Sequence, residues 1–378
     1  FAMVDASVRN ALLWIAANDS SAGNRALVAR ILPTVPAAGS DDDDDGEEDD
    51  DDDENVRCII ERIKDVDCKV REAALDALRT RVDFEEQLTE DQRVEILRNG
   101  LTKRCATTYA KTVELLCTNW LKSTRFDPIA LLDRLNPVLN EAVCERASRV
   151  LLRVASTIDC ETDADEGVAL VRKHLGGPEI RELRCTVLKK RSIVPPPIPA
   201  RGGTDEDDAG EDETQKGIGG SSAPALGTST ALFLRVQCDI SANKSDTITD
   251  IVSDIPTLCN LLNGHIDRLI EFNNDEDYDE VDEDEAAAFE DDQNFLCLQL
   301  IHMAKSSELR EEGSRRHFIT IMRRILSRLA TPDDLVEACV KAMATAHDKE
   351  SQFLQTVSEI LVDVEDDDTF RCPSGHDE

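Results

Sequence analysis

The sequence predicts an all-α fold, a HEAT-repeat α-solenoid in which helical hairpins stack into a superhelix. Three observations predict it. Apolar residues recur at helical spacing along almost the whole chain, turn signals divide it into segments of roughly 10–20 residues, and one helix opening occurs twice. Stretches that alternate apolar and polar residues as strands do are essentially absent from the sequence.

The repeated opening is an aspartate followed three places later by Val-Arg. It occurs at Asp5 with Arg9 and again at Asp67 with Arg71, 62 residues further on. Leaving out the 15 residues of the acidic stretch 40–54 shortens this distance to 47 residues, within the roughly 40–47 residues of a HEAT-type repeat. A single hairpin cannot bury both of its faces, so repeated hairpins bury them by stacking.

The two arginines of this motif are expected to be structural, each pairing with an acid of the neighbouring repeat. The alternative is that Arg9 and Arg71 face a ligand. A third, degenerate copy is expected at 101–116, where Thr108-Tyr109 replaces Val-Arg.

The individual helices are predicted from the same spacing. In residues 68–82 seven apolar residues form one broad face, and Asp67 is placed to cap the first turn. Helices are expected likewise at 89–99, 103–122, 127–135, 139–157, 163–175, 179–191, 228–242, 246–272, 286–306, 309–329, 332–346 and 349–362.

Turn and capping residues predict several helix ends. Thr89 and Gln92 have the spacing of a capping box. Pro128 and Pro332 are expected at first helical positions, where proline costs no hydrogen bond. Gly100 is placed where a glycine commonly ends a helix.

Acidic tracts and a Pro/Gly-rich stretch divide the chain. The tracts 41–54, 205–213 and 271–292 carry 13, 7 and 13 acids and no base, and they account for all but −3 of the net charge of −36. Like charges repel one another and stay solvated, which predicts disorder. The predicted organisation is N-terminal HEAT repeats at 1–191 with a disordered insert at 37–54, a disordered linker at 192–227, C-terminal helical repeats at 228–363 with a disordered insert at 273–285, and a disordered tail at 364–378.

Signatures of catalysis and cofactor binding do not occur in the sequence, which has no P-loop, no HExxH and no GxSxG. The protein is therefore predicted not to be an enzyme and to need no cofactor. Cys372 and His376 form a single pair, whereas a structural zinc ion needs four ligands.

The twelve cysteines are scattered singly, which fits a reducing compartment, and no membrane-spanning or targeting segment is recognisable. The acidic tracts lack the ligand spacing of a calcium-binding loop. They are therefore expected to be solvated loops, and the alternative is that they bind a basic, histone-like partner.

Three basic clusters are candidates for contact with DNA phosphates. Rows of Arg and Lys on a solenoid contact phosphates without reading base sequence. The alternative is an ordinary solvated helix surface, balanced near the third cluster by Glu311 and Glu312. The clusters are Arg62, Lys64, Lys69 and Arg79 with neighbouring Arg81; Lys189, Lys190 and Arg191; and Arg315, Arg316, Arg323, Arg324 and Arg328.

Several motifs resemble the CAP-G family, the HEAT-repeat subunits of condensin. They are Lys64-Asp65 leading to Val70-Arg71, Arg93 leading to Gly100-Leu101, the helix end Trp120-Leu121, and the turn Glu311–Arg315 within LCLQLIHMAKSSELREEGSRRHFITIMRRIL. The matches recur in order over most of 55–362. The three acidic or Pro/Gly-rich inserts and Thr108-Tyr109 depart from the family pattern. Family members are much longer, so the resemblance implies a middle section.

The resemblance implies a partner set and a location. Members of this family bind the kleisin subunit of condensin, reach the SMC ATPase subunits through it, and hold double-stranded DNA in a basic groove. A nuclear and mitotic-chromosome location is expected, with the cytoplasm in interphase, and neither a membrane nor a small-molecule substrate is expected. Two other functions remain open: a generic HEAT adaptor, such as a transport receptor or phosphatase scaffold, and an acidic histone chaperone.

Overall fold

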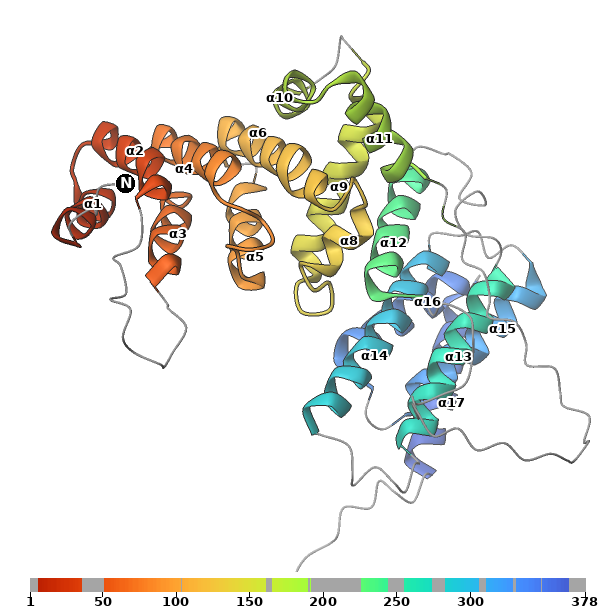
Figure 1. Cartoon of the computed structure of the whole chain (residues 1–378). Helices are drawn as coiled ribbons and strands as arrows, with labels where there is room; N and C mark the ends of the chain where they lie inside the picture. The colour runs from red at the N-terminus through yellow and green to blue at the C-terminus, as the bar shows by residue number, and fades with distance from the viewer. Residues whose placement is uncertain are drawn as a thin grey trace, which may run out of the picture. The chain divides into compact units, whose positions relative to one another are not determined.

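Helices form every regular element of the part of the chain that the computed structural model describes (Figure 1). The all-α fold expected from the sequence is therefore confirmed. The chain divides into two compact units, unit 1 at Phe1–Lys189 and unit 2 at Lys190–Glu378. The described residues are 6–35, 51–102, 104–160, 165–189, 191, 226–243, 255–273, 283–305, 311–328, 331–347 and 349–366.

Unit 1 is built of helical hairpins. Its elements are α1 (Ala6–Asn18), α2 (Ala22–Ile31), the 3-10 turn η1 (Leu32–Thr34), α3 (Asp51–Arg62), α4 (Cys68–Arg81), α5 (Glu90–Gly100), α6 (Ala106–Leu115), the π-helical segment η2 (Leu116–Trp120), α7 (Leu121–Ser123), α8 (Pro128–Asp133), α9 (Glu141–Thr157), α10 (Glu166–His174) and α11 (Gly177–Val187).

These helices form two layers. The pairs α1–α2, α3–α4 and α5–α6 pack as hairpins. The second helices α2, α4, α6 and α10 pack side by side in one layer, and α1, α3, α5, α9 and α11 pack in the other (Figure 1). We call them the second-helix layer and the first-helix layer. This arrangement is the stacking of hairpins that the repeated opening predicts.

Unit 2 has the same two-layer order. Its helices are α12 (Thr228–Asn243), α13 (Ile255–Asn273), α14 (Glu283–Lys305), α15 (Glu312–Leu326), α16 (Asp333–Ala346) and α17 (Glu350–Asp366). The neighbours α12, α14 and α16 pack in one layer, α13 packs on α15, and α14 and α16 pair with these as hairpins. One continuous core of apolar residues runs from Leu234 of α12 to Ile360 of α17.

The core of unit 1 shows why the predicted helical face exists. Ala73 and Ala74 of α4 are fully buried. Ala26 and Ala29 of α2 pack against Val70 and Ala73 in one cluster, and these small side chains let the two helices approach closely. Further along, the rings of Phe84 and Trp120 lie with centroids 4.9 Å apart.

Helix boundaries differ from expectation mainly at the acidic tracts. Two helices, at 22–31 and 51–62, were not expected separately, and α3 begins at Asp51, inside the insert predicted at 37–54. Similarly, α14 begins at Glu283 inside the insert predicted at 273–285, and α17 continues into the predicted tail. Acidic residues are favourable in the first turn of a helix because the N-terminal end of the helix dipole is positive. The remainder of these tracts, most of the linker and the rest of the tail lie outside the described residues.

The predicted caps are mostly present. Thr89 and Gln92 form the capping box at α5, and Asp127 caps α8 with Pro128 in its first turn. Pro332, expected at a first helical position, is instead the N-cap residue of α16, with φ −60° and ψ 149°. The proline ring fixes φ at about −65°, a value that suits both the N-cap and the first helical position, so the sequence alone does not distinguish these two positions.

The first copy of the predicted repeat was placed wrongly. Asp5 lies outside the described residues, and α1 is the first helix of its hairpin, whereas α4 is the second. The structural counterpart of Asp67 and Arg71 is Ser21 and Arg25, 46 residues earlier. Since 46 already lies within the roughly 40–47 residues of the repeat, the acidic stretch is part of the repeat length.

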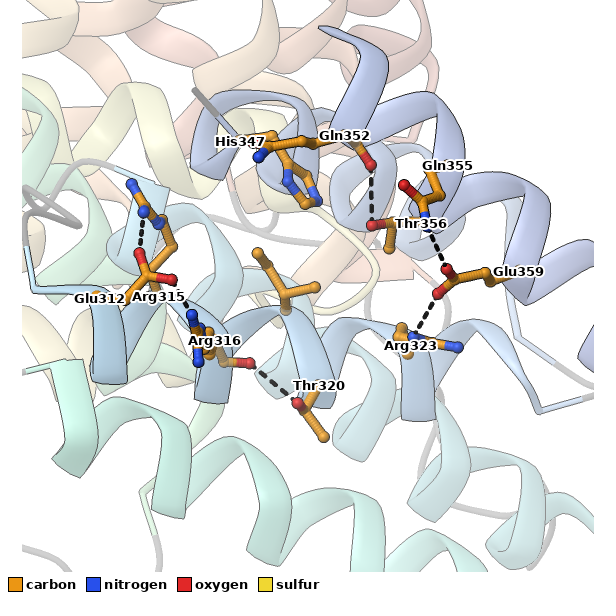
Figure 2. A pocket seen from close by; sticks show the side chains of 11 residues that line it. Glu312, Arg315, Arg316, Thr320, Arg323, His347, Gln352, Gln355, Thr356 and Glu359 are labelled. Carbon is orange, nitrogen blue, oxygen red and sulfur yellow. Dashed lines mark hydrogen bonds and ion pairs between the residues drawn. The ribbon is translucent and has the colours of Figure 1, made fainter. Parts of the chain in front are cut away.

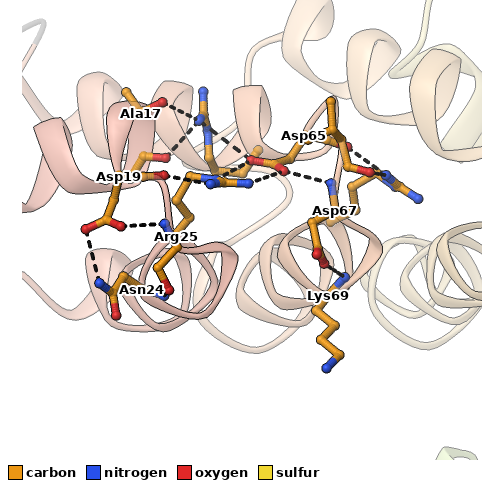
Figure 3. Close-up of polar contacts among 12 residues, drawn as sticks. Ala17, Asp19, Asn24, Arg25, Asp65, Asp67 and Lys69 are labelled. Atoms are coloured by element: carbon orange, nitrogen blue, oxygen red, sulfur yellow. Dashed lines mark hydrogen bonds and ion pairs between the residues drawn. The ribbon is translucent and has the colours of Figure 1, made fainter.

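Equivalent hydrogen bonds establish this correspondence (Figure 3). The amide of Ser21 donates to Asp19 Oδ1 at 2.7 Å, and the amide of Asp67 donates to Asp65 Oδ1 at 2.9 Å. Arg25 Nη1 donates to the carbonyl six residues before it, at 2.6 Å, and Arg71 does the same. The guanidinium of Arg25 also makes a two-bond contact with Asp65, at 2.8 and 2.9 Å, which joins one hairpin to the next.

The structural role expected for the two arginines is confirmed for Arg9. It lies 3.3 Å from Glu54 of α3, and its Nε donates to Asn55 Oδ1 at 3.2 Å. Arg71 instead reaches the next hairpin through the Thr108 hydroxyl, at 3.0 Å. An acid partner was therefore the wrong expectation for Arg71, although its side chain does join two repeats.

Candidate nucleic-acid interface

Two cations of the first predicted cluster are engaged by neighbouring hairpins. Arg62 Nη1 donates to the Ala16 carbonyl at 2.8 Å, near the C-terminal end of α1. Lys64 lies 3.0 Å from Glu61 and forms a second ion pair with Glu95 of α5. Both side chains connect elements of the solenoid, so phosphate contact would have to compete with these bonds.

The other two cations of that cluster differ from each other. Arg79 lies 3.2 Å from the buried carboxylate of Glu114. Lys69 is exposed in the first turn of α4, and its side chain has no ion pair with any described residue. Of the four, Lys69 is the one whose charge is open to an external anion.

Glu114 is the centre of an electrostatic cluster. It is fully buried, and basic side chains from three second-layer helices surround it: Arg79 of α4 at 3.2 Å, Lys111 of α6 at 3.1 Å and His174 of α10 at 2.9 Å. Lys111 also lies 2.9 Å from Asp76 of α4. The carboxylate therefore holds three neighbouring helices together, and Arg79 is part of this structural cluster.

The second predicted cluster is divided by the unit boundary. Lys189 is exposed after the end of α11 in unit 1. Lys190 lies outside the described residues. Arg191, in unit 2, places its guanidinium 5.2 Å from the ring centroid of Phe233, a cation–π contact.

The third cluster lies on α15, where the arginines pair with acids. Arg315 and Arg316 share the Glu312 carboxylate, at 2.6 Å from Arg316 Nε. Arg323 reaches Glu359 of α17 at 3.0 Å. Arg316 and Arg323 share one face, as their spacing predicts, because both line one groove between α15 and α17 (Figure 2).

The remaining two arginines of that cluster point to other helices. Arg324 lies 2.5 Å from Asp267 of α13. Arg328 has a side chain only 11% exposed and lies 3.9 Å from Glu290 of α14. Both act as cross-links within unit 2.

A different set of cations is open to solvent. Each of its members is exposed and makes no ion pair with any residue in the described ranges, and each lies on or beside one of the four second-layer helices. Each lies within the first or last two residues of its helix, or just before the helix, so its exposure comes from that position in the hairpin. Local charge density in the sequence identifies only Lys69 and Arg81 of this set, because what the members share is their position in the hairpin. We call this set the second-layer cations: Arg30, Lys69, Arg81, Arg104 and Lys173.

Among the described residues, neither the thiols nor any cluster of His, Asp and Glu side chains forms a second candidate site. Burial raises the pKa of Cys117 and of Cys144 to about 12, so both stay protonated at neutral pH. Hydrogen bonds from Thr107 and Thr108, with Arg71 nearby, lower the pKa of Cys105 to about 6.

Among the described residues, no three His, Cys, Asp or Glu side chains are grouped to hold a metal ion. Cys372 and His376 lie outside those residues. No helix in the described ranges has the length and apolar character needed to cross a membrane.

Two comparisons with known proteins find similarity to condensin subunits. No protein-family model matches the chain. Condensin complex subunit 3 of Xenopus laevis is 22% identical over 307 residues, which cover 80% of this chain and 25% of that protein. A chain of the crystal structure of the S. pombe condensin Cnd3-Cnd2 subcomplex matches with a TM-score of 0.63 and 19% identity, over 94% of this chain and 37% of that one. This chain thus spans about a quarter of the curated relative, and the two matches confirm the resemblance to the HEAT-repeat subunit of condensin that the sequence motifs predict.

Proposed function

We propose that this chain is a section of a non-catalytic HEAT-repeat subunit of condensin, which binds a kleisin and double-stranded DNA. The observation that carries the proposal is the sequence similarity to condensin complex subunit 3 over 80% of the chain. The ATPase activity of such an assembly would belong to the SMC subunits, reached through the kleisin. The proposed location is the nucleus and the mitotic chromosomes.

The second-layer cations support the DNA part of the proposal. Five exposed cations, which form no ion pair with any described residue, lie along four adjacent helices and can neutralise phosphates at intervals set by the helix spacing of roughly 8–10 Å. Such contacts carry no sequence information, so binding would depend on salt and hardly on base sequence. Lys189 is a further candidate, whereas the ion-paired arginines of α15 are weaker ones.

The solved relative supports the kleisin part. Its structure contains Cnd3 together with Cnd2, the pairing of a HEAT subunit with a kleisin that the resemblance implies. We propose that this chain contributes part of the corresponding kleisin-binding surface.

A gel shift with charge-reversed variants tests the DNA proposal. One variant carries Arg30→Glu, Lys69→Glu and Arg81→Glu, in the second-helix layer. The matched control carries Arg98→Glu, Arg146→Glu and Arg181→Glu, three exposed arginines on α5, α9 and α11 of the first-helix layer. We expect at least a tenfold loss of affinity for two unrelated 30-bp duplexes in the first variant and less than a threefold loss in the control. Equal losses in both would show that charge alone, and not this layer, determines binding.

Co-purification tests the kleisin proposal separately. The tagged chain, expressed with a kleisin, should recover it from lysate in stoichiometric amount. Recovery of transport cargo or a phosphatase subunit in its place would support the generic HEAT adaptor.

A further inference from the structure

A polar groove lies between two neighbouring helices of unit 2 (Figure 2). It has a volume of about 470 Å³. One wall is α15, from Glu312 to Arg323, and the other is α17, from Gln352 to Glu359. Packed helices normally meet through apolar side chains, yet the residues that line this groove are polar apart from Ile319. The space is therefore built of groups that hydrogen-bond.

The two walls offer different chemistry. On α15, Arg316 is 78% exposed and shares the Glu312 carboxylate with Arg315, so guanidinium donors of Arg316 remain open to a second anion. On α17, Gln352 and Gln355 are three residues apart on one face. Gln355 Nε2 donates to Glu359 Oε1 at 3.1 Å, which leaves its second N–H and its carbonyl oxygen for a ligand, and the Gln352 amide can both donate and accept. Ile319 supplies the apolar part of the lining.

We propose that this groove binds an extended peptide segment that places an acidic side chain on Arg316 and an apolar side chain on Ile319. The amides of Gln352 and Gln355 pair with the peptide backbone, which presents both donors and acceptors. The wall from residue 312 to 323 measures about 16 Å at the helical rise of 1.5 Å per residue, the length of about five extended residues.

The same features disfavour duplex DNA as the occupant. The groove has a volume of about 470 Å³ and lies between α15 and α17, so its two walls are close together. Its lining also contains the carboxylates of Glu312 and Glu359, which are acceptors and have no use for a ligand that presents only phosphates. A peptide can offer groups of both signs. The ion pair of Arg323 with Glu359, at 3.0 Å, ties the walls together at one end.

Selection from a random dodecapeptide library on the full chain tests the proposal. The selected peptides are then measured by fluorescence anisotropy on Arg316→Glu and on Thr320→Trp, which fills the groove without removing a charge. The matched control is Lys341→Glu on α16, since Lys341, like Arg316, is an exposed cation paired with the acid four residues before it. Circular dichroism establishes that each variant is folded.

We expect selected peptides to carry Asp or Glu near an apolar residue, and to bind at least tenfold more weakly to both groove variants but not to the control. The proposal is overturned if no peptide is enriched, if enriched peptides bind all variants equally, or if a 30-bp duplex displaces them from the groove. The groove lies in unit 2 and the second-layer cations in unit 1, so either proposal can fail alone.

Discussion

Glu114 shows how a single buried charge is made tolerable in this fold. Its carboxylate is fully buried, whereas the side chains of Arg79, Lys111 and His174 around it are 22%, 24% and 34% exposed. A buried charge is costly unless it is compensated, and here the compensation comes from three helices. Because these three side chains keep contact with water, they remain partly hydrated when the carboxylate is removed, which limits the loss of folding free energy.

Glu114→Gln should destabilise unit 1 by about 2–3 kcal/mol, somewhat less than the 3–5 kcal/mol of a fully buried broken pair. Urea unfolding followed by circular dichroism measures the change. Glu61→Gln removes a 48%-exposed partner of Lys64 and should cost at most about 1 kcal/mol. Equal costs for the two changes would mean that the cluster does not hold the layer together.

Cys105 is predicted to be an unusually reactive thiol. Its pKa is lowered from 9.0 to about 6, first by the Thr107 hydroxyl 3.2 Å away and then by Thr108 and Arg71. A lowered pKa means that the thiolate is populated above about pH 6, so alkylation by iodoacetamide should reach half its maximal rate near that pH.

Mass spectrometry of the alkylated chain checks this expectation, with buried Cys117 as the unreactive internal control. Thr107→Val removes the first hydrogen bond and should shift the midpoint to higher pH. A midpoint for Cys105 near pH 9.0, the ordinary thiol pKa, would contradict the assigned environment.

The candidate site was only partly predictable at the scale of single residues. Lys69 was identified from local charge, and it is one of the exposed cations. Arg62, Arg79 and Arg324 were identified by the same signal, yet each is bonded to a group distant in sequence. Local charge density does not show which cations meet acids of another hairpin, because those pairs depend on the stacking.

Close packing between elements depends on glycine at one contact in particular. A Cβ added to Gly100, the last residue of α5, would lie 2.2 Å from Oγ1 of Thr112, a fully buried residue of α6. Gly100 therefore does more than end the helix, because it permits α5 and α6 to approach.

Gly100→Ala should destabilise unit 1 by about 1–2 kcal/mol, since overpacking outweighs the helix propensity of alanine. Adding Thr112→Ala should recover part of this loss, a coupling that a double-mutant cycle measures. At Gly264 of α13 an added Cβ meets nothing within 4 Å, so Gly264→Ala should instead stabilise its helix by about 0.5–1 kcal/mol. A neutral Gly100→Ala would contradict the close contact.

Elements were predicted well where the signal is local. The capping box of Thr89 and Gln92 and the Asp67 cap are interactions within one turn, and both are present. The assignment of first and second helices in a hairpin is not local, because α1 and α4 carry the same Val-Arg pair in different layers. Acidic helix starts were missed because composition alone suggested disorder.

At the scale of the whole molecule, the net charge of −36 is compatible with DNA binding because the acids are concentrated in tracts. Deleting residues 41–50 removes nine acids and leaves Glu54, the partner of Arg9, in place. We expect the deletion to strengthen DNA binding at low salt and to have little effect at high salt, where charge is screened. If the deletion abolishes histone binding and does not change the affinity for DNA, the result would support the histone-chaperone function instead.

The central claim is that the second-helix layer of unit 1 neutralises DNA phosphates, and the salt dependence of binding tests it most directly. The logarithm of the binding constant should fall linearly with the logarithm of the salt concentration, with a slope of about −0.9 for each phosphate contacted. Charge reversal of Arg30, Lys69 and Arg81 should make this slope less steep by about 2–3, and reversal of Arg98, Arg146 and Arg181 should leave it unchanged. An unaltered slope in the first variant, or the same change in both, would contradict the claim.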